Sequence, residues 1–254
     1  MKFSESLPEN VKIACASLLG MDEIPLTEIQ YYHHLRENPR MQSASLFILN
    51  ETPYGTSVGC YDIDVAKRLM SAMPIDSPIL SETNRRRFCQ LLEEKIQIRS
   101  LSYGRFFCAD IRSFRKVLPP EGYQVKRLSP NELVGVLVPK YKTYGILVDG
   151  EIVSRGSMAE FVDDVYPISR IVSVYTIPSY RQRGLGKATV SACTLDALSR
   201  EKIPIYSAEV ENVASLRTCM AVGYYPYGES LEIFGQISVK KVVQDVSAAA
   251  INKA

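Results

Sequence analysis

The sequence has few of the residues that build a metal centre. Its 254 residues contain only two histidines, His33 and His34, and none of its six cysteines stands in a C-x-x-C pair. A structural zinc site takes four Cys or His ligands, usually in closely spaced pairs. We therefore expect no zinc cage and no metal cofactor. The wide and irregular spacing of the cysteines indicates reduced thiols.

The sequence also lacks a long apolar run and an excess of charge of one sign. No charge-free stretch approaches the roughly 20 residues that span a bilayer. Glu5, Glu9 and Lys12 interrupt the start of the chain, where a signal peptide needs an apolar core. The formal net charge is +2, whereas nucleic-acid-binding domains usually have a strong basic excess. We expect a cytoplasmic protein that binds neither membranes nor nucleic acids.

The chain does contain enough apolar material for a core. Its 46% hydrophobic and 23% charged residues are typical of globular proteins, and its length suits one large domain or two modest ones. Pro119-Pro120 followed by Glu121-Gly122 indicates a boundary. We expect an N-terminal domain at residues 1–118, a second domain at 121–240 and a tail at 241–254.

A helix is expected in the N-terminal part, at residues 81–98. Apolar residues recur there at helical spacing, at Phe88, Leu91, Leu92 and Ile96. Ser81 stands at the position of an N-cap. We interpret the arginine run 85–87 as a solvated face of this helix. A patch that binds anions or nucleic acid is the alternative.

After residue 121 the pattern changes to short strands and helices. Asp149-Gly150 lies between two β-branched runs, which predicts a type I′ hairpin. The expected elements that follow are a strand at 168–178, an amphipathic helix at 187–202, a strand at 204–212, a helix from Asn212 to Gly223 and one or two strands at 231–243. Helices between strands after a hairpin indicate an α/β or α+β fold with a mixed sheet.

The stretch TIPSYRQRGLGKA, residues 176–188, is a basic loop with two glycines. It is not a P-loop, because Arg181 replaces the first glycine and Ala188 the final Ser or Thr. The third glycine of a dinucleotide fingerprint is also missing. Gly184 and Gly186 leave room for an anion beside the backbone, and the following helix begins with unpaired N–H groups. We expect a pyrophosphate site; a plain turn is the alternative.

This order of strand, proline, R-x-x-G-x-G and helix resembles motif A of the GCN5-related N-acetyltransferase (GNAT) superfamily, V-x-P-x-Y-R-x-x-G-x-G. Asn212, Ser215 and Gly223-Tyr224 stand at the spacing of that family's N-x-x-S/A and closing G-F/Y. The resemblance covers about residues 121–240 and is closest to the FR47-like, glycine N-acyltransferase-like branch. It implies a mixed, mostly antiparallel central sheet flanked by helices. The first part of the chain would be an α/β extension, a degenerate acetyltransferase half that shapes the acceptor pocket.

The resemblance implies an N-acyltransferase that moves an acetyl or other acyl group from acyl-CoA to a primary amine of a small molecule, an amino acid or a peptide. The residues that would hold acetyl-CoA are Val174, Tyr175, Thr176, Arg181, Gln182, Arg183, Gly184, Leu185, Gly186, Lys187, Ala188, Asn212 and Ser215. The amides of the loop would bind the pyrophosphate, and the strand edge would pair with the pantetheine. A strand N–H would polarise the carbonyl. Helix capping is the alternative role for Asn212 and Ser215.

The reaction also needs a group that takes the proton of the attacking amine. Many relatives have a glutamate on the central strand, but residues 168–178 contain no acidic residue. Glu160, Glu209 and Glu211 on neighbouring elements are the candidates for this base. Surface carboxylates and a water chain are the alternatives.

A second departure concerns the acid that protonates the leaving thiolate. The family's tyrosine, seven residues after the motif asparagine, is replaced here by Cys219. Cys219 is the candidate acid, helix packing is its alternative role, and three tyrosines could substitute: Tyr224, Tyr225 and Tyr227. Because both usual groups are missing, an acyl-CoA-binding sensor or structural module is the alternative to an enzyme. The acceptor amine, the acyl chain and the oligomeric state are left open, a homodimer included.

Overall fold

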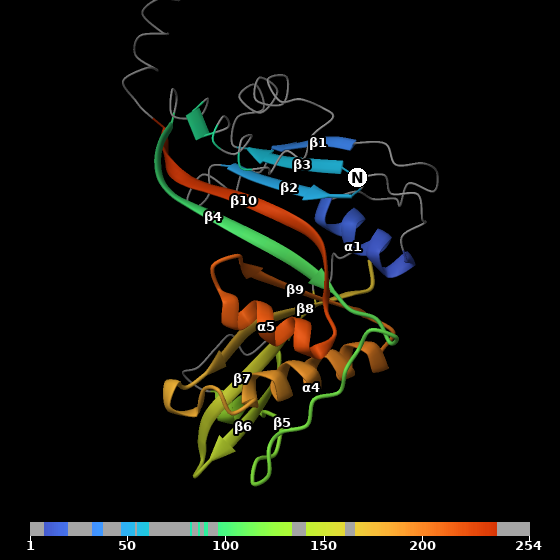
Figure 1. Ribbon diagram of the computed structural model, residues 1–254, viewed down its shortest axis with the longest axis vertical. Coiled ribbons are helices and arrows are strands. Elements are labelled where there is room, and N and C mark those ends of the chain that lie inside the picture. Colours follow the sequence, from blue (N-terminus) through green and yellow to red (C-terminus); the bar gives the residue numbers. More distant parts are fainter. Residues whose placement is uncertain are drawn as a thin grey trace, which may run out of the picture. The chain divides into compact units, whose positions relative to one another are not determined.

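The computed structural model describes residues 8–19, 32–37, 47–53, 55–60, 82, 86, 89–90, 96–133, 141–160 and 166–237. The chain forms two compact units (Figure 1). Unit 1 comprises Met1–Leu26 and Arg105–Gly228, and unit 2 comprises Thr27–Gly104 and Glu229–Ala254. This division differs from the boundary predicted at Pro119-Pro120, since each unit is assembled from two distant parts of the sequence.

Unit 1 is built on a mixed sheet. Its elements are α1 (Glu9–Leu19), β5 (Lys126–Arg127), η2 (Pro130–Leu133), β6 (Lys142–Val148), β7 (Glu151–Ala159), β8 (Ile168–Thr176), η3 (Pro178–Tyr180), α4 (Leu185–Ser199), β9 (Ile203–Glu209) and α5 (Val213–Val222), together with parts of β4 (Ile96–Cys108) and β10 (Tyr225–Ile237). The strand order is β10–β4–β9–β8–β7–β6–β5. Strands β5 to β8 are antiparallel neighbours, and β9 runs parallel to β8. The predicted mixed, mostly antiparallel sheet is confirmed.

Helices cover both faces of this sheet. α4 and α5 contact each other, α4 contacts β7 and β8, and α5 contacts β9 (Figure 1). The core beneath them includes one face of α4, at Val190, Cys193 and Ala197, as expected of an amphipathic helix. Ile171 of β8 points into the same core, so its neighbour Arg170 points to the other face. There the Arg170 guanidinium donates to Ser17 Oγ of α1 at 3.4 Å.

The local signals in unit 1 act as predicted. Asp149 and Gly150 join β6 to β7 with positive φ angles of 49° and 83°, which a type I′ turn requires at both central positions. Asn212 caps α5, since its side chain accepts the Ser215 N–H at 3.1 Å. Gly223 ends that helix in the left-handed region, at φ 101°, which glycine adopts without steric cost.

Unit 2 is a smaller group of strands. It contains β1 (Tyr32–Glu37), β2 (Phe47–Thr52) and β3 (Gly55–Cys60), with the remaining parts of β4 and β10. The order is β1–β3–β2–β10–β4, with β1 parallel to β3 and β2 antiparallel to both β3 and β10 (Figure 1). None of the helices in the described ranges is long and apolar enough to cross a membrane.

The helix predicted at 81–98 lies mostly outside the described residues. Glu82, Arg86 and Cys89 are helical, but Ile96 begins strand β4, so the prediction is wrong at its C-terminal end. The alternation of Ile96 and Ile98 around a polar residue is a strand pattern. Arg86 donates to Glu82 Oε1 at 2.5 Å, one turn away on an exposed surface, in line with a solvated helix face.

Candidate functional site

Strands β8 and β9 pair over their first halves and then separate. Their parallel ladder runs from Ile168 opposite Ile203 to Ile171 opposite Tyr206. Both strands continue beyond this point, and no further pairing joins them within the described ranges. The lining of a pocket of about 730 Å³ comes from these continuing strand segments and from the first turns of α4 and α5. It consists of Val174, Tyr175, Thr176, Tyr180, Arg181, Gln182, Gly184, Leu185, Gly186, Lys187, Tyr206, Asn212, Ala214, Ser215, Arg217 and Thr218.

A β-bulge shapes the part of β8 that borders the pocket. Arg155 of β7 is paired with Tyr175, whereas Ser157, two residues on, is paired with Val172. β8 therefore contains an extra residue, and Ser173 takes a positive φ of 53°. Bulges bend a strand and change the direction of its side chains. Val174 packs toward the core under α4.

The loop before α4 leaves the start of the helix open. Gly184 is the N-cap of α4, at φ 82°. A Cβ added at Gly184 would meet no heavy atom within 4 Å, and one at Gly186 would meet only Thr176 Oγ1, at 3.3 Å. The first N–H groups of a helix have no intrahelical partner. A phosphate group can approach them here, because no side chain occupies the space.

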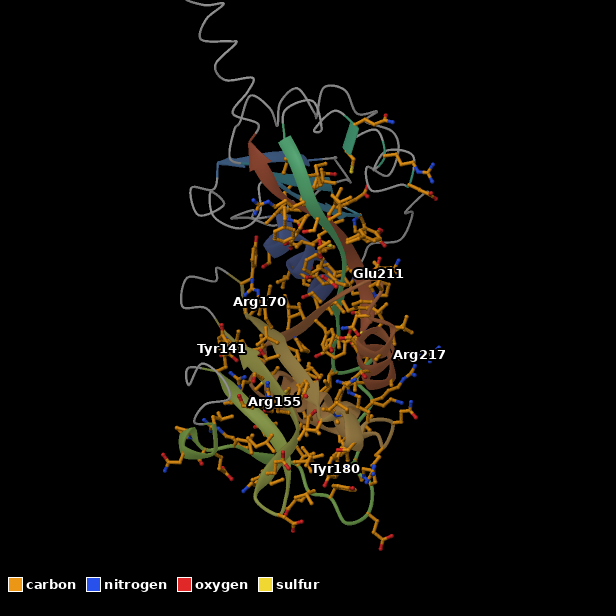
Figure 2. All side chains as sticks on the ribbon, turned by 90° about the vertical axis from the view of Figure 1, so that its left-hand side faces the viewer. Tyr141, Arg155, Arg170, Tyr180, Glu211 and Arg217 are labelled. Carbon is orange, nitrogen blue, oxygen red and sulfur yellow. The ribbon has the colours of Figure 1, made fainter. Side chains whose placement is uncertain are left out.

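Positive charge surrounds this end of the pocket. Arg181 and Lys187 belong to the lining, and Arg181 Nε donates to the Thr176 carbonyl at 3.1 Å. Arg217 on α5 adds a third cationic side chain to the lining (Figure 2). No Asp or Glu is among the described lining residues. The site therefore suits a polyanion.

The third basic residue of the loop points elsewhere. Arg183 Nη1 donates to the Tyr123 hydroxyl at 3.1 Å, and Nη2 donates to the Ser179 carbonyl at 3.1 Å. The Arg183 guanidinium also lies 5.1 Å from the centre of the Tyr180 ring. Its side chain is thus held outside the lining. Of the predicted co-substrate residues, only Arg183 and Ala188 are missing from the lining, Ala188 because it is buried in α4.

The lining contains one buried phenol that the sequence did not indicate. Tyr206 of β9 is 3% exposed, and its hydroxyl lies 2.7 Å from Ser215 Oγ on α5. Burial raises the pKa of Tyr206 to about 12, so the phenol keeps its proton at neutral pH. The available signal was the alternation along β9, which places Tyr206 and Ala208 on the same face of the strand. Both residues belong to the core under α4.

The predicted base candidates do not reach the pocket. Glu160, at the end of β7, forms an ion pair with Arg200 Nη2 at 2.5 Å and accepts from Ser169 Oγ at 3.3 Å. The hydrogen bond from Arg200 holds the pKa of Glu160 below its usual value. Glu209 and Glu211 are exposed at the end of β9 and in the turn before α5. None of the three is in the lining.

The predicted acid candidates lie in or beside the core. Cys219 is fully buried, its Sγ donates to the Leu216 carbonyl at 3.1 Å, and burial raises its pKa to about 12. The Tyr224 hydroxyl bonds Thr194 Oγ1 at 2.8 Å within the same core. The other two tyrosines, Tyr225 and Tyr227, are also outside the lining. This geometry matches the packing alternative, because α5 turns position 219 away from the pocket.

The described residues contain no group of three or more His, Cys, Asp or Glu side chains that could hold a metal ion. The basic loop, open helix terminus and diverging strands of the pocket have the size and charge to hold an extended phosphorylated molecule such as acyl-CoA. The residues present fit that group.

Comparisons with known proteins agree with this geometry. Residues 106–224 match the sequence model of the Acetyltransferase (GNAT) family. The match starts before the predicted residue 121, and it specifies no branch. No curated protein matches the sequence.

Solved structures of similar arrangement are also found. A GCN5-related N-acetyltransferase from Kribbella flavida is similar over 91% of this chain and 96% of its own, with 14% identity and a TM-score of 0.48. One from Sphaerobacter thermophilus is similar over 68% and 64%, with 12% identity and a TM-score of 0.46. A GCN5-related N-acetyltransferase-like protein from Streptococcus suis is similar over 60% and 68%, with 19% identity and a TM-score of 0.42. At these values none of them bears on what this chain binds.

Proposed function

We propose that residues 106–224, which match the model of the Acetyltransferase (GNAT) family, are an acetyltransferase domain of the GNAT superfamily, and that the protein is an N-acyltransferase. It transfers an acetyl or other acyl group from acyl-CoA to a primary amine of a small molecule, an amino acid or a peptide. The observation that supports the proposal is the pocket between β8 and β9, with the open N-terminus of α4 on its border. Membership of the FR47-like branch and a cytoplasmic location belong to the same proposal.

The phosphate end of the pocket binds the nucleotide part of the co-substrate. The amides of the loop and of the first turn of α4 donate to the diphosphate, for which Gly184 and Gly186 leave space. Arg181 and Lys187 neutralise part of its charge, and Arg217 is placed for a further phosphate. The unpaired edge of β8 hydrogen-bonds the pantetheine amides as an added strand would.

The opposite end of the pocket performs the transfer. The co-substrate supplies the thioester whose acyl carbon reacts. The amine nitrogen forms a bond to that carbon, the carbon–sulfur bond breaks, the amine loses one proton and the sulfur gains one. The Val174 or Thr176 N–H polarises the carbonyl, and Ser215, hydrogen-bonded to Tyr206, donates a hydrogen bond to the sulfur as charge develops on it.

We assign no side chain as the base. Among the described residues the lining has no carboxylate or histidine, and Glu160 is held ionised by Arg200. The proton of the attacking amine therefore passes to water. Shielding by protein is needed only for the thioester, so a hydrated route for the amine is compatible with turnover.

The lack of a carboxylate or histidine that could act as general base in the described lining also favours a second candidate, an acyl-CoA-binding sensor without turnover. The experiment that separates the two measures free thiol when acetyl-CoA is mixed with the protein and a panel of amines. Thiol release that depends on an amine, with the acylated amine identified by mass spectrometry, supports the enzyme. Bound acetyl-CoA with no amine-dependent thiol favours the sensor.

A further inference from the structure

Arg155 and Tyr175 form a cation–π pair beside the pocket. They are direct cross-strand partners on β7 and β8, and the Arg155 guanidinium carbon lies 5.1 Å from the centre of the Tyr175 ring. Tyr175 belongs to the pocket lining and is 41% exposed. It follows Val174, whose N–H is one of the two proposed to polarise the acyl carbonyl. The pair is therefore next to the expected site of reaction.

The pair faces away from α4. A Cβ at Gly156 would lie 3.4 Å from Cys193 Sγ of α4, so Gly156 faces that helix. Successive residues of a strand point to opposite faces, and Arg155 therefore points to the other face of the sheet (Figure 2). The phosphate loop and α4 are on the Gly156 side. An amine that enters from the Arg155 side approaches the thioester without crossing the bound nucleotide.

Within the part of the chain that the structure describes, Arg155 has no anionic partner. Its Nε is buried and donates no hydrogen bond, and among the described residues its only interaction is with Tyr175. Burial lowers the pKa of Arg155 from its usual value. The lost hydration of the guanidinium is thus not replaced by a neighbouring negative charge among the described residues. Buried polar groups in proteins, such as this Nε, are normally hydrogen-bonded. A guanidinium left in this state is suited to a carboxylate, which it binds through two parallel hydrogen bonds.

We propose that Arg155, supported by the Tyr175 ring, binds the carboxylate of the acceptor, and that the acceptor is therefore an amino acid. This inference rests on the proposed function, because it names the substrate of the same site. The amino group of an amino acid is only two bonds from its carboxyl carbon. A carboxylate held at Arg155 consequently keeps the amine close to the strand segment that contains Tyr175.

The test compares matched acceptors. Wild type, Arg155→Gln and Arg170→Gln are assayed for amine-dependent thiol release with the standard amino acids and with the carboxamide of each. Each kcat/KM is expressed per concentration of neutral amine, because an amino acid and its carboxamide differ in the pKa of the amine. Arg170→Gln is the control, since it removes an equal charge from the same face of the sheet at a residue that bonds Ser17 of α1, whereas Arg155 contacts the lining residue Tyr175. Wild type and Arg170→Gln should prefer the free acid by about 10- to 100-fold in kcat/KM, the range expected for one charged hydrogen-bonded pair. Arg155→Gln should lose that preference and keep its activity on the amide.

Other results overturn the inference. Equal kcat/KM for acid and amide in wild type, expressed per concentration of neutral amine, excludes a carboxylate site. An equal loss of both activities in Arg155→Gln shows a structural role for the pair. If acetyl-CoA binds but no amine releases thiol, the proposed transfer fails, and amino acids are then titrated calorimetrically into the acetyl-CoA-loaded protein. Arg155-dependent binding in that titration supports the carboxylate site, and no binding overturns it.

Discussion

The hydroxyl of Tyr206 lies 2.7 Å from the hydroxyl of Ser215. The first residue belongs to β9 and the second to α5, so the contact joins a strand and a helix on the border of the pocket. Tyr206 is also packed against Tyr224, with 5.7 Å between ring centres. A phenol with a pKa raised to about 12 by burial does not give up its proton fully to a thiolate, but it strengthens Ser215 as a hydrogen-bond donor.

Removal of this pair should slow the transfer without weakening co-substrate binding. We predict that Tyr206→Phe and Ser215→Ala each lower kcat about tenfold, the loss expected for one hydrogen bond made in the transition state. Phe keeps the ring packing, and Ala keeps the backbone N–H of residue 215, which donates to the side chain of the N-cap Asn212. Because the two hydroxyls act as one unit, the double variant should be no slower than the slower single variant. Unchanged kcat in both single variants would remove the pair from the mechanism.

The pH dependence should be set by the amine and not by the protein. With no base in the described lining, only the neutral amine reacts, and kcat/KM should rise about tenfold per pH unit up to the pKa of the amine. That limit is about 8 for the α-amino group of a peptide and about 10.4 for a lysine side chain. The measurement is a set of pH profiles for amines of different pKa. A plateau at one pH for all of them would show that a protein group takes the proton.

Glu160 should matter for stability and not for rate. The pKa of Glu160 is lowered in the folded state, mainly by the hydrogen bond from Arg200. Its contribution to the free energy of unfolding is therefore complete above the pKa that Glu160 has in the unfolded chain, and it is lost as the pH falls through the lower pKa of the folded state. We predict that Glu160→Gln lowers the free energy of unfolding by about 1 kcal/mol at pH 7, with a difference that shrinks below about pH 4. Denaturant unfolding at several pH values measures this. A tenfold loss of kcat at unchanged stability would instead make Glu160 the base.

Gly223 should be more sensitive to substitution than other left-handed glycines. A Cβ there would lie 1.9 Å from the Ser113 carbonyl oxygen, in a segment tied to α5 by the Arg115 N–H bond to the Val222 carbonyl at 2.9 Å. Gly150 has a similar φ of 83° with nothing within 4 Å. We predict a cost of about 1 kcal/mol for Gly150→Ala and roughly 2 kcal/mol more for Gly223→Ala. Equal melting temperatures of the two variants would contradict the close contact.

Local chemistry explains what could be predicted from the sequence. The Asp149-Gly150 turn, the Asn212 cap and the Gly223 stop depend on residues within one turn of each other, and the structure has all three. The loop before α4 could be predicted for the same reason. Glycines such as Gly184 and Gly186 are typical of a loop where a ligand approaches the backbone closely.

The parts that escaped prediction depend on residues far apart in the chain. Glu160 was a candidate base because its ion-pair partner, Arg200, is forty residues later in the sequence, at the C-terminal end of α4. The contact of Tyr206 with Ser215 could not be predicted, because it depends on how β9 packs against α5. The strand that begins at Ile96 was mistaken for the end of a helix, because a short apolar run fits both periods and only pairing with neighbouring strands decides between them.

Calorimetric titration of acetyl-CoA tests the central claim most directly, with wild type, Gly184→Glu and Gly150→Glu. Both glycines have φ near 80° and open space around the missing Cβ, so the two variants have equal backbone strain and equal added charge. We predict micromolar binding by wild type and Gly150→Glu, and a loss of about 100-fold or more in Gly184→Glu, where the new carboxylate enters the diphosphate site. Folded wild type that binds neither acetyl-CoA nor longer acyl-CoAs, or equal binding by the two variants, would contradict the claim.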